Sequence, residues 1–145
     1  MKNSIAYYDW ANLQWINFVY SHDWPEEYLP KLMNHIIKAE RAWIEIIREI
    51  EWNRDLWQIE SLEQLILLRK ANQTQFSTIL QGNLDRRVVV KRLNGQVYNP
   101  TIQDIILHIL SHGDHHRGQM SRYVASKSLK APNTDYIAFC IEHQL

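Results

Sequence analysis

The sequence predicts an all-α fold, a four-helix bundle with a small β-hairpin before the fourth helix and a short C-terminal helix. Apolar residues recur at helical spacing in four long segments, and only 4 glycines and 4 prolines interrupt the 145 residues. The connections between these segments are short or moderate, as in helix bundles. With 46% hydrophobic and 22% charged residues, the chain has the composition of a single domain spanning residues 1–145.

The first three helices are predicted from periodicity and from residues typical of helix ends. Apolar residues at helical spacing place the first helix at residues 4–21. The second is expected at residues 25–50, because a proline followed by two glutamates suits a helix N-terminus. Ser61, with Gln64 three residues later, forms a candidate capping box that opens the third helix, which is expected to end near Gly82.

The remaining elements follow from a change of pattern after the third helix. Between residues 87 and 98, β-branched residues flank Asn94-Gly95, a pair that favours a tight turn, and this predicts the hairpin. Thr101 is expected to cap the fourth helix, whose apolar face is continuous. Asn133 or Thr134 is expected to start the terminal helix.

Composition also argues against several functional classes. The 16 basic residues balance the 16 acidic ones without forming a basic patch, so nucleic acid is not expected as a partner. The N-terminal residues lack the apolar core of a secretion signal, and no run approaches the roughly 18 apolar residues of a membrane span. We therefore expect a cytoplasmic protein without a membrane partner. The single cysteine, Cys140, cannot form an internal disulfide, and its apolar neighbours predict a buried thiol.

The predicted fourth helix contains four histidines, and their directions around the helix axis divide them into two groups. A helical projection places His116 about 40° and His112 about 80° from the centre of the apolar stripe, with His108 and His115 beyond about 120°. Residues four apart lie roughly 6 Å apart along the axis, so His112 and His116 can converge on one ion. His108 and His116 are roughly 12 Å apart and cannot share it. The third ligand must come from another helix, and His35, at the edge of an apolar stripe, is the candidate.

Two interpretations of His35, His112 and His116 are open at this point. Three imidazoles suit a divalent cation such as zinc, nickel, copper or iron, and would leave coordination positions for water or another ligand. In the other interpretation all three are hydrogen-bonded structural histidines of the core or of a cleft. The spacing favours the metal site.

The stretch Leu107–Gln119, LHILSHGDHHRGQ, resembles the H-x-x-x-H-R-G-Q signature of the DinB family (DinB/YfiT-like metal-binding four-helix-bundle proteins). The resemblance covers nearly the whole chain and extends to Tyr8–Asn12, to His35 followed by Ala39-Glu40 and Trp43, and to Thr134–Ile137. It implies an up-down-down-up bundle that often forms a homodimer. It also implies that His35, His112 and His116 are the family's metal triad, usually described with nickel or zinc.

The resemblance further implies two classes of function. Related proteins include thiol-dependent S-transferases and a mycothiol-dependent maleylpyruvate isomerase. The first hypothesis is therefore a metal-dependent thiol S-transferase or hydrolase acting on a small electrophile, with a low-molecular-weight thiol as a second cofactor. The alternative is a non-catalytic, stress-related metal-binding protein whose ion is mainly structural. No catalytic base can be assigned from the sequence.

Several residues near the signature have open roles. Arg117 is expected either to pair with a buried carboxylate, which we favour, or to hold an anionic ligand near the ion, and the role of Gln119 is open. Glu40 and Asp114 are candidate carboxylates that support the ligands, although Asp114 faces away from the apolar stripe and suits a surface position equally well. Three tryptophans are candidates for the wall of a substrate pocket: Trp10, Trp15 and Trp43.

Overall fold

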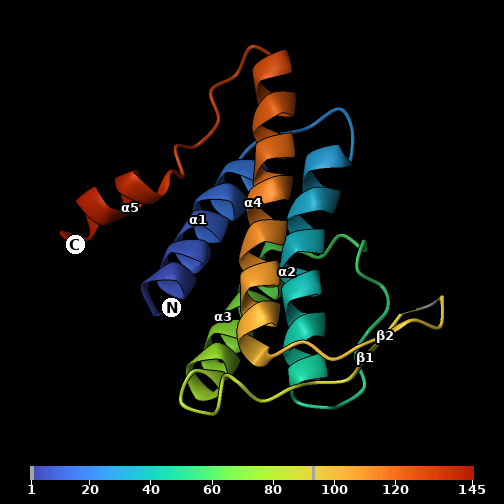
Figure 1. Cartoon of the computed structure of the whole chain (residues 1–145). Helices are drawn as coiled ribbons and strands as arrows, with labels where there is room; N and C mark the ends of the chain where they lie inside the picture. The colour runs from blue at the N-terminus through green and yellow to red at the C-terminus, as the bar shows by residue number, and fades with distance from the viewer. Residues whose placement is uncertain (1, 93) are drawn as a thin grey trace.

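The computed structural model describes residues 2–92 and 94–145, and within these ranges the chain is mostly helical, as predicted (Figure 1). The elements, in chain order, are α1 (Lys2–Tyr20), α2 (Tyr28–Ile47), α3 (Leu62–Ile79), β1 (Val90–Lys91), β2 (Val97–Tyr98), α4 (Ile102–Ser126) and α5 (Tyr136–Glu142). The four long helices, the hairpin before α4 and the short C-terminal helix confirm the predicted fold class.

The helices run up, down, down and up, as the resemblance implied (Figure 1). α1 and α4 are parallel, because Tyr8 lies against Gly113 and Asn12, one turn later, bonds to Arg117. The segment between α2 and α3 runs back along α2, so that Glu60 bonds to α2 just before α3 begins. This long return makes α3 parallel to α2.

Side-chain caps fix the start of two helices as the sequence indicated. Ser61 accepts a hydrogen bond from the Gln64 N–H at 3.2 Å, and Thr101 forms a reciprocal capping box with Asp104. α2, in contrast, begins at Tyr28, three residues later than expected. Proline fits the first turn of a helix, where N–H groups have no intrahelical partner, and Pro30 occupies such a position.

The other helix boundaries shift for local reasons. α2 ends at Ile47 because Glu49, with a φ of 58°, has left the right-handed helical region. α5 begins at Tyr136, later than the expected start at residues 133–134, and packs on α1 through Phe139. Cys140 is half-buried, so the prediction of a buried thiol was too strong.

The hairpin is short and lies at the end of the bundle where α2 ends and α4 begins (Figure 1). Val90 pairs with Tyr98 and Lys91 with Val97 in antiparallel register. Gly95, in the connecting loop, has a φ of 83°, which favours glycine at this position.

The core lies between the four long helices and consists mainly of aliphatic side chains. Its fully buried members include Trp15, Leu29, Ile36, Ile44 and Ile106. In the described part of the chain, no helix combines the length and apolar character that crossing a membrane requires.

Candidate metal centre

Two antiparallel helices bring the three predicted histidines together. His112 and His116 lie one turn apart on α4, and His35 faces them from α2. The His112 Nε2 lies 3.2 Å from the His35 Nε2 and 3.1 Å from the His116 Nε2. One ring nitrogen from each residue lies within 4.8 Å of the other two. These three residues are called the histidine triad below.

The spacing of these nitrogens fits a shared metal ion. Nitrogens bound at about 2.0 to 2.1 Å around a tetrahedral zinc ion are roughly 3.3 Å apart. The His116 Nδ1 lies 2.7 Å from the Gln119 Oε1, which can only accept, so Nδ1 carries the proton and Nε2 offers a lone pair. Gln119 therefore has a role that the sequence left open: it fixes the tautomer that a metal ligand needs.

The protonation of the triad also suits metal binding. Burial, followed by the neighbouring His116, lowers the pKa of His35 to about 4. Burial, followed by the neighbouring His116 and His35, lowers the pKa of His112 to about 3. Both imidazoles are therefore neutral at neutral pH, and the neutral form is the one that coordinates metals.

One side of the triad is accessible. His35 is 8% exposed, while His112 and His116 are only half-buried. Among residues 2–92 and 94–145, no fourth histidine, cysteine or acidic residue joins the group. Three protein ligands with an accessible side are typical of zinc sites that bind water or substrate.

A comparison with protein-family models matches the DinB family over residues 25–143. The chain belongs to the DinB family. The matched range contains all three histidines of the triad, and the three-histidine cluster of this DinB chain fits metal binding. A comparison with curated proteins gave no match.

Two of the predicted wall tryptophans lie elsewhere in the DinB domain. Trp15 is buried in the core, and Trp10 packs against α5. Trp43 contacts the ring of His108, with 4.9 Å between centroids. No pattern in the sequence indicated Trp57, which stacks on the His35 ring with 3.8 Å between ring centroids and an interplanar angle of 8°. It comes from the irregular segment between α2 and α3, where no periodicity indicates facing.

The other two histidines of α4 do not enter the triad. His108 and His115 are both exposed, in agreement with the projection. The His108 ring lies 5.9 Å from that of His112, centroid to centroid, on the hairpin side of the triad. Partial burial, followed by the charge of Arg92, lowers the pKa of His108.

Arg117 of the DinB signature joins α4 to α1. It is 4% exposed, donates to the Asn12 side chain and lies 5.0 Å from the centre of the Tyr8 ring. It also pairs with Asp114, whose side chain is 56% exposed. These contacts fit the structural interpretation of Arg117, but its carboxylate partner is largely exposed rather than buried. Asp114 accepts a hydrogen bond from Arg117 and, in the described residues, forms no hydrogen bond or ion pair with a histidine of the triad.

Glu40, the other candidate carboxylate, points into the core instead of supporting the triad. It is 1% exposed, and in the described residues neither carboxylate oxygen has a hydrogen-bond partner. Burial, followed by the charge of Asp9, raises the pKa of Glu40 to about 8. Tyr8, also without a partner for its hydroxyl in these residues, and Asn72 lie close by. Tyr8, Asp9, Glu40 and Asn72 form the core polar cluster.

Proposed function

We propose that this DinB protein binds one divalent metal ion, zinc or nickel, through the Nε2 atoms of His35, His112 and His116. We further propose that it acts as a metal-dependent thiol S-transferase on a small electrophile. The observation that carries the proposal is the convergence of three Nε2 atoms on one point with an accessible side. Imidazole ligands suit both metals.

The chain's own groups prepare this site. Gln119 fixes the tautomer of His116, and Trp57 covers one face of His35 and restrains the orientation of its ring. When bound, the ion would lower the pKa of a thiol or water ligand and so supply a nucleophile at neutral pH. A low-molecular-weight thiol is the proposed second cofactor. With water in its place, the same site would act as a hydrolase.

A non-catalytic function is the second candidate, and one observation favours it. The ligands come from two helices that are far apart in the chain, so a bound ion would link α2 to α4. The ion would then mainly stabilise the bundle, in a protein that responds to stress. Metal removal would lower the free energy of unfolding in both cases, because the ion binds the folded state only.

The metal content of purified variants tests the ligand set. Elemental analysis of the wild type, after exchange into zinc, should find about one ion per chain. His112→Ala and His116→Ala should each abolish binding, while His108→Ala and His115→Ala, on exposed positions of the same helix, should retain it. Equal metal content in all four variants would refute the site.

Titration of the cobalt-substituted protein with a small thiol separates the two functions. A thiol that binds the ion changes the visible spectrum, because a sulfur ligand alters the ligand field. Transferase function requires this change, with saturation by the thiol. A spectrum that does not respond to the thiol would leave the structural ion as the function of the site.

We also propose that the protein forms a homodimer. Several apolar side chains around α5 and the neighbouring part of α4 are exposed, among them Leu107 (63%), Ile137 (67%) and Ile141 (75%). Exposed apolar residues of this kind favour association between copies. Sedimentation equilibrium should give twice the mass of one chain, and Ile137→Lys should shift the equilibrium towards the monomer.

A further inference from the structure

A cavity of about 440 Å³ lies beside the histidine triad, between the C-terminal half of α2, the segment that follows it and the hairpin. Its walls are mainly apolar and aromatic: Trp43, Ile46, Trp52, Leu56 and Val90. Cavities of this size accept small organic molecules, and apolar walls bind them by removing apolar surface from water.

The charged side chains that line this cavity are all cationic. Arg54, Lys91 and Arg92 line it, and none of the described residues that form its wall is acidic. None of the three forms an ion pair with another described residue. The chain as a whole has a formal net charge of +0, so this clustering of cations is local.

Two of these cations are held in place by aromatic rings. The Arg54 guanidinium lies 4.4 Å from the centre of the Trp52 ring, and that of Arg92 lies 5.2 Å from the centre of the Tyr98 ring. Stacking of this type restrains a long side chain while leaving its N–H donors available. A ligand would therefore lose less side-chain entropy on binding to them.

Three contacts place this cavity next to the triad. Ala39, in its wall, lies one turn after His35 on the same face of α2. Leu56, also in the wall, borders the His35 ring and directly precedes Trp57, which stacks on that ring. Trp43 contacts His108, whose ring is a neighbour of His112.

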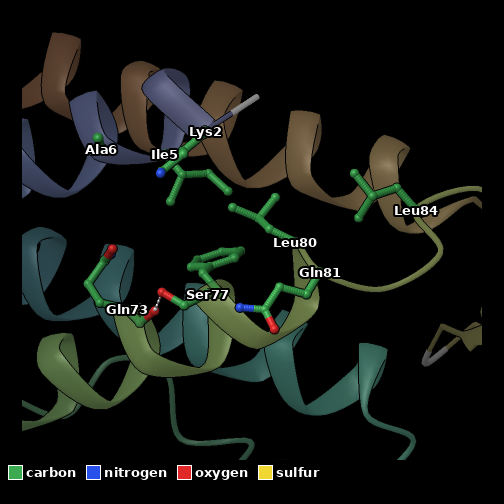
Figure 2. Close-up of a pocket in the computed structure, with 9 residues that line it drawn as sticks. Lys2, Ile5, Ala6, Gln73, Ser77, Leu80, Gln81 and Leu84 are labelled. Atoms are coloured by element: carbon green, nitrogen blue, oxygen red, sulfur yellow. Dashed lines mark hydrogen bonds between the residues drawn. The ribbon is translucent and has the colours of Figure 1, made fainter.

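A second cavity, of about 600 Å³, provides a contrast (Figure 2). It lies between α1 and α3, where Ile5, Phe76 and Leu80 belong to the apolar part of its wall and Lys2 is its one cation among the described residues. It lies away from the triad, and no group of cations is arranged to orient a ligand. Of these two cavities, the one beside the triad combines apolar walls, several cations and a candidate reactive centre.

We propose that the cavity beside the triad binds a small organic anion with an apolar or aromatic body, such as an aryl-substituted carboxylate. The body lies between Trp43 and Trp52, and the anionic group lies at Arg54, Lys91 and Arg92. The other end of the molecule points to the triad. The identification of this anion as the substrate rests on the proposed function, whereas its binding does not.

Three probes that share one apolar body and carry an anionic, a neutral or a cationic terminal group test the binding. Phenylbutanoate, phenylbutanol and phenylbutylammonium share one apolar body, and calorimetry on the metal-free protein compares their dissociation constants. Phenylbutanoate should bind about tenfold more tightly than the alcohol, since each exposed charge pair contributes a factor of a few, and the ammonium should bind most weakly. Equal affinity for the three probes would overturn the proposal.

Paired variants locate the source of the selectivity. Arg54→Gln combined with Lys91→Gln should reduce the preference for phenylbutanoate to about twofold. Arg122→Gln combined with Lys130→Gln removes the same charge from exposed positions outside the cavity and should preserve the preference. A preference that falls equally in both double variants would mean that net charge, not this cavity, selects the anion.

Repeating the titrations with zinc-loaded protein separates this proposal from the proposed function. If the preference for phenylbutanoate appears only with zinc, the carboxylate binds the ion, and the proposed role of the three cations is overturned. If the protein takes up no zinc and still prefers phenylbutanoate, the result supports anion binding in the cavity and refutes the metal site. Trp52→Ala should weaken the binding of all three probes, because it removes part of the cavity wall that contacts their common apolar body.

Discussion

The histidine triad and the core polar cluster both include residues of α2, and they differ in how their polar atoms are placed. In the triad three Nε2 atoms face one another, a glutamine holds one tautomer and one side is accessible. In the core polar cluster Glu40 is enclosed, and its oxygens and the Tyr8 hydroxyl have no partner in the described residues. Burial shifts the pKa values of residues in both clusters, so a shifted pKa by itself does not identify a ligand site.

The difference lies in which protonation state burial favours. Burial keeps His35 and His112 neutral with an available lone pair, which is the state that a cation binds. Burial keeps Glu40 protonated near neutral pH, which removes the charge that a cation would need. The triad is therefore prepared for a ligand, whereas the core polar cluster costs stability whenever Glu40 ionises.

Replacing Glu40 tests this cost and should have the largest effect. The raised pKa, about 8 in place of 4.5, means that the folded state keeps a proton that the unfolded state releases. The contribution of Glu40 to stability is thus present below about pH 4.5 and lost as the pH rises towards 8. Glu40→Gln does not titrate, so at pH 8 its free energy of unfolding should exceed that of the wild type by about 4 kcal/mol.

Urea unfolding of the metal-free proteins between pH 5 and pH 8 measures this difference. The histidines titrate equally in both proteins, so their contribution cancels when the two are compared at the same pH. A difference that stays constant with pH would mean that Glu40 is ionised in the folded state.

Gly113 lies where the two clusters approach, and its replacement should have the second-largest effect. A Cβ at this position would overlap the Cε2 of Tyr8, which is 1% exposed. Gly113→Ala should lower the free energy of unfolding by about 2 kcal/mol through overpacking. Urea unfolding measures this loss.

Gly118 is the matched control on the same helix. A Cβ there meets no atom within 4 Å, so Gly118→Ala should keep or raise stability, by up to about 1 kcal/mol from helix propensity. Equal stability of the two alanine variants would show that Tyr8 does not pack against α4 as described.

Gln119→Leu tests the hydrogen bond that orients His116. Loss of such a partner typically lowers metal affinity by about 10-fold to 100-fold, and we expect the lower end because Gln119 is exposed. Competition with a zinc-binding dye measures the affinity. Gln103→Leu, also exposed on α4 but remote from the triad, should leave it unchanged.

The sequence was sufficient to predict the parts of the fold that depend on residues close together in the chain. Helical periodicity located the four long helices, and the caps at Ser61 and Thr101 were identified because capping depends on residues three apart. The start of α2 was misplaced, since both Pro25 and Pro30 are compatible with a first helical turn. Only packing of the following residues selects between them.

The candidate site was predictable to the extent that it depends on one helix. Projection along α4 separated His112 and His116 from His108, since the angle between residues of one helix is fixed. Glu40 was predicted as a carboxylate that supports the ligands, but it lies about 140° around α2 from His35 and points into the core. The sequence does not show which helix packs against each face of α2, because that depends on tertiary packing. Trp57 could not be found, since the segment that contains it has no regular period.

Trp57 also provides the smallest of the expected effects. Trp57 is 49% exposed, yet its ring stacks on His35 almost in parallel, so it restrains the imidazole without sealing the triad. Trp57→Ala should weaken zinc binding about threefold, since a half-exposed stack contributes less than a buried one. Trp52→Ala, in the same segment but without contact to the triad, is the matched control. An unchanged affinity in Trp57→Ala would mean that the α2 backbone alone positions His35.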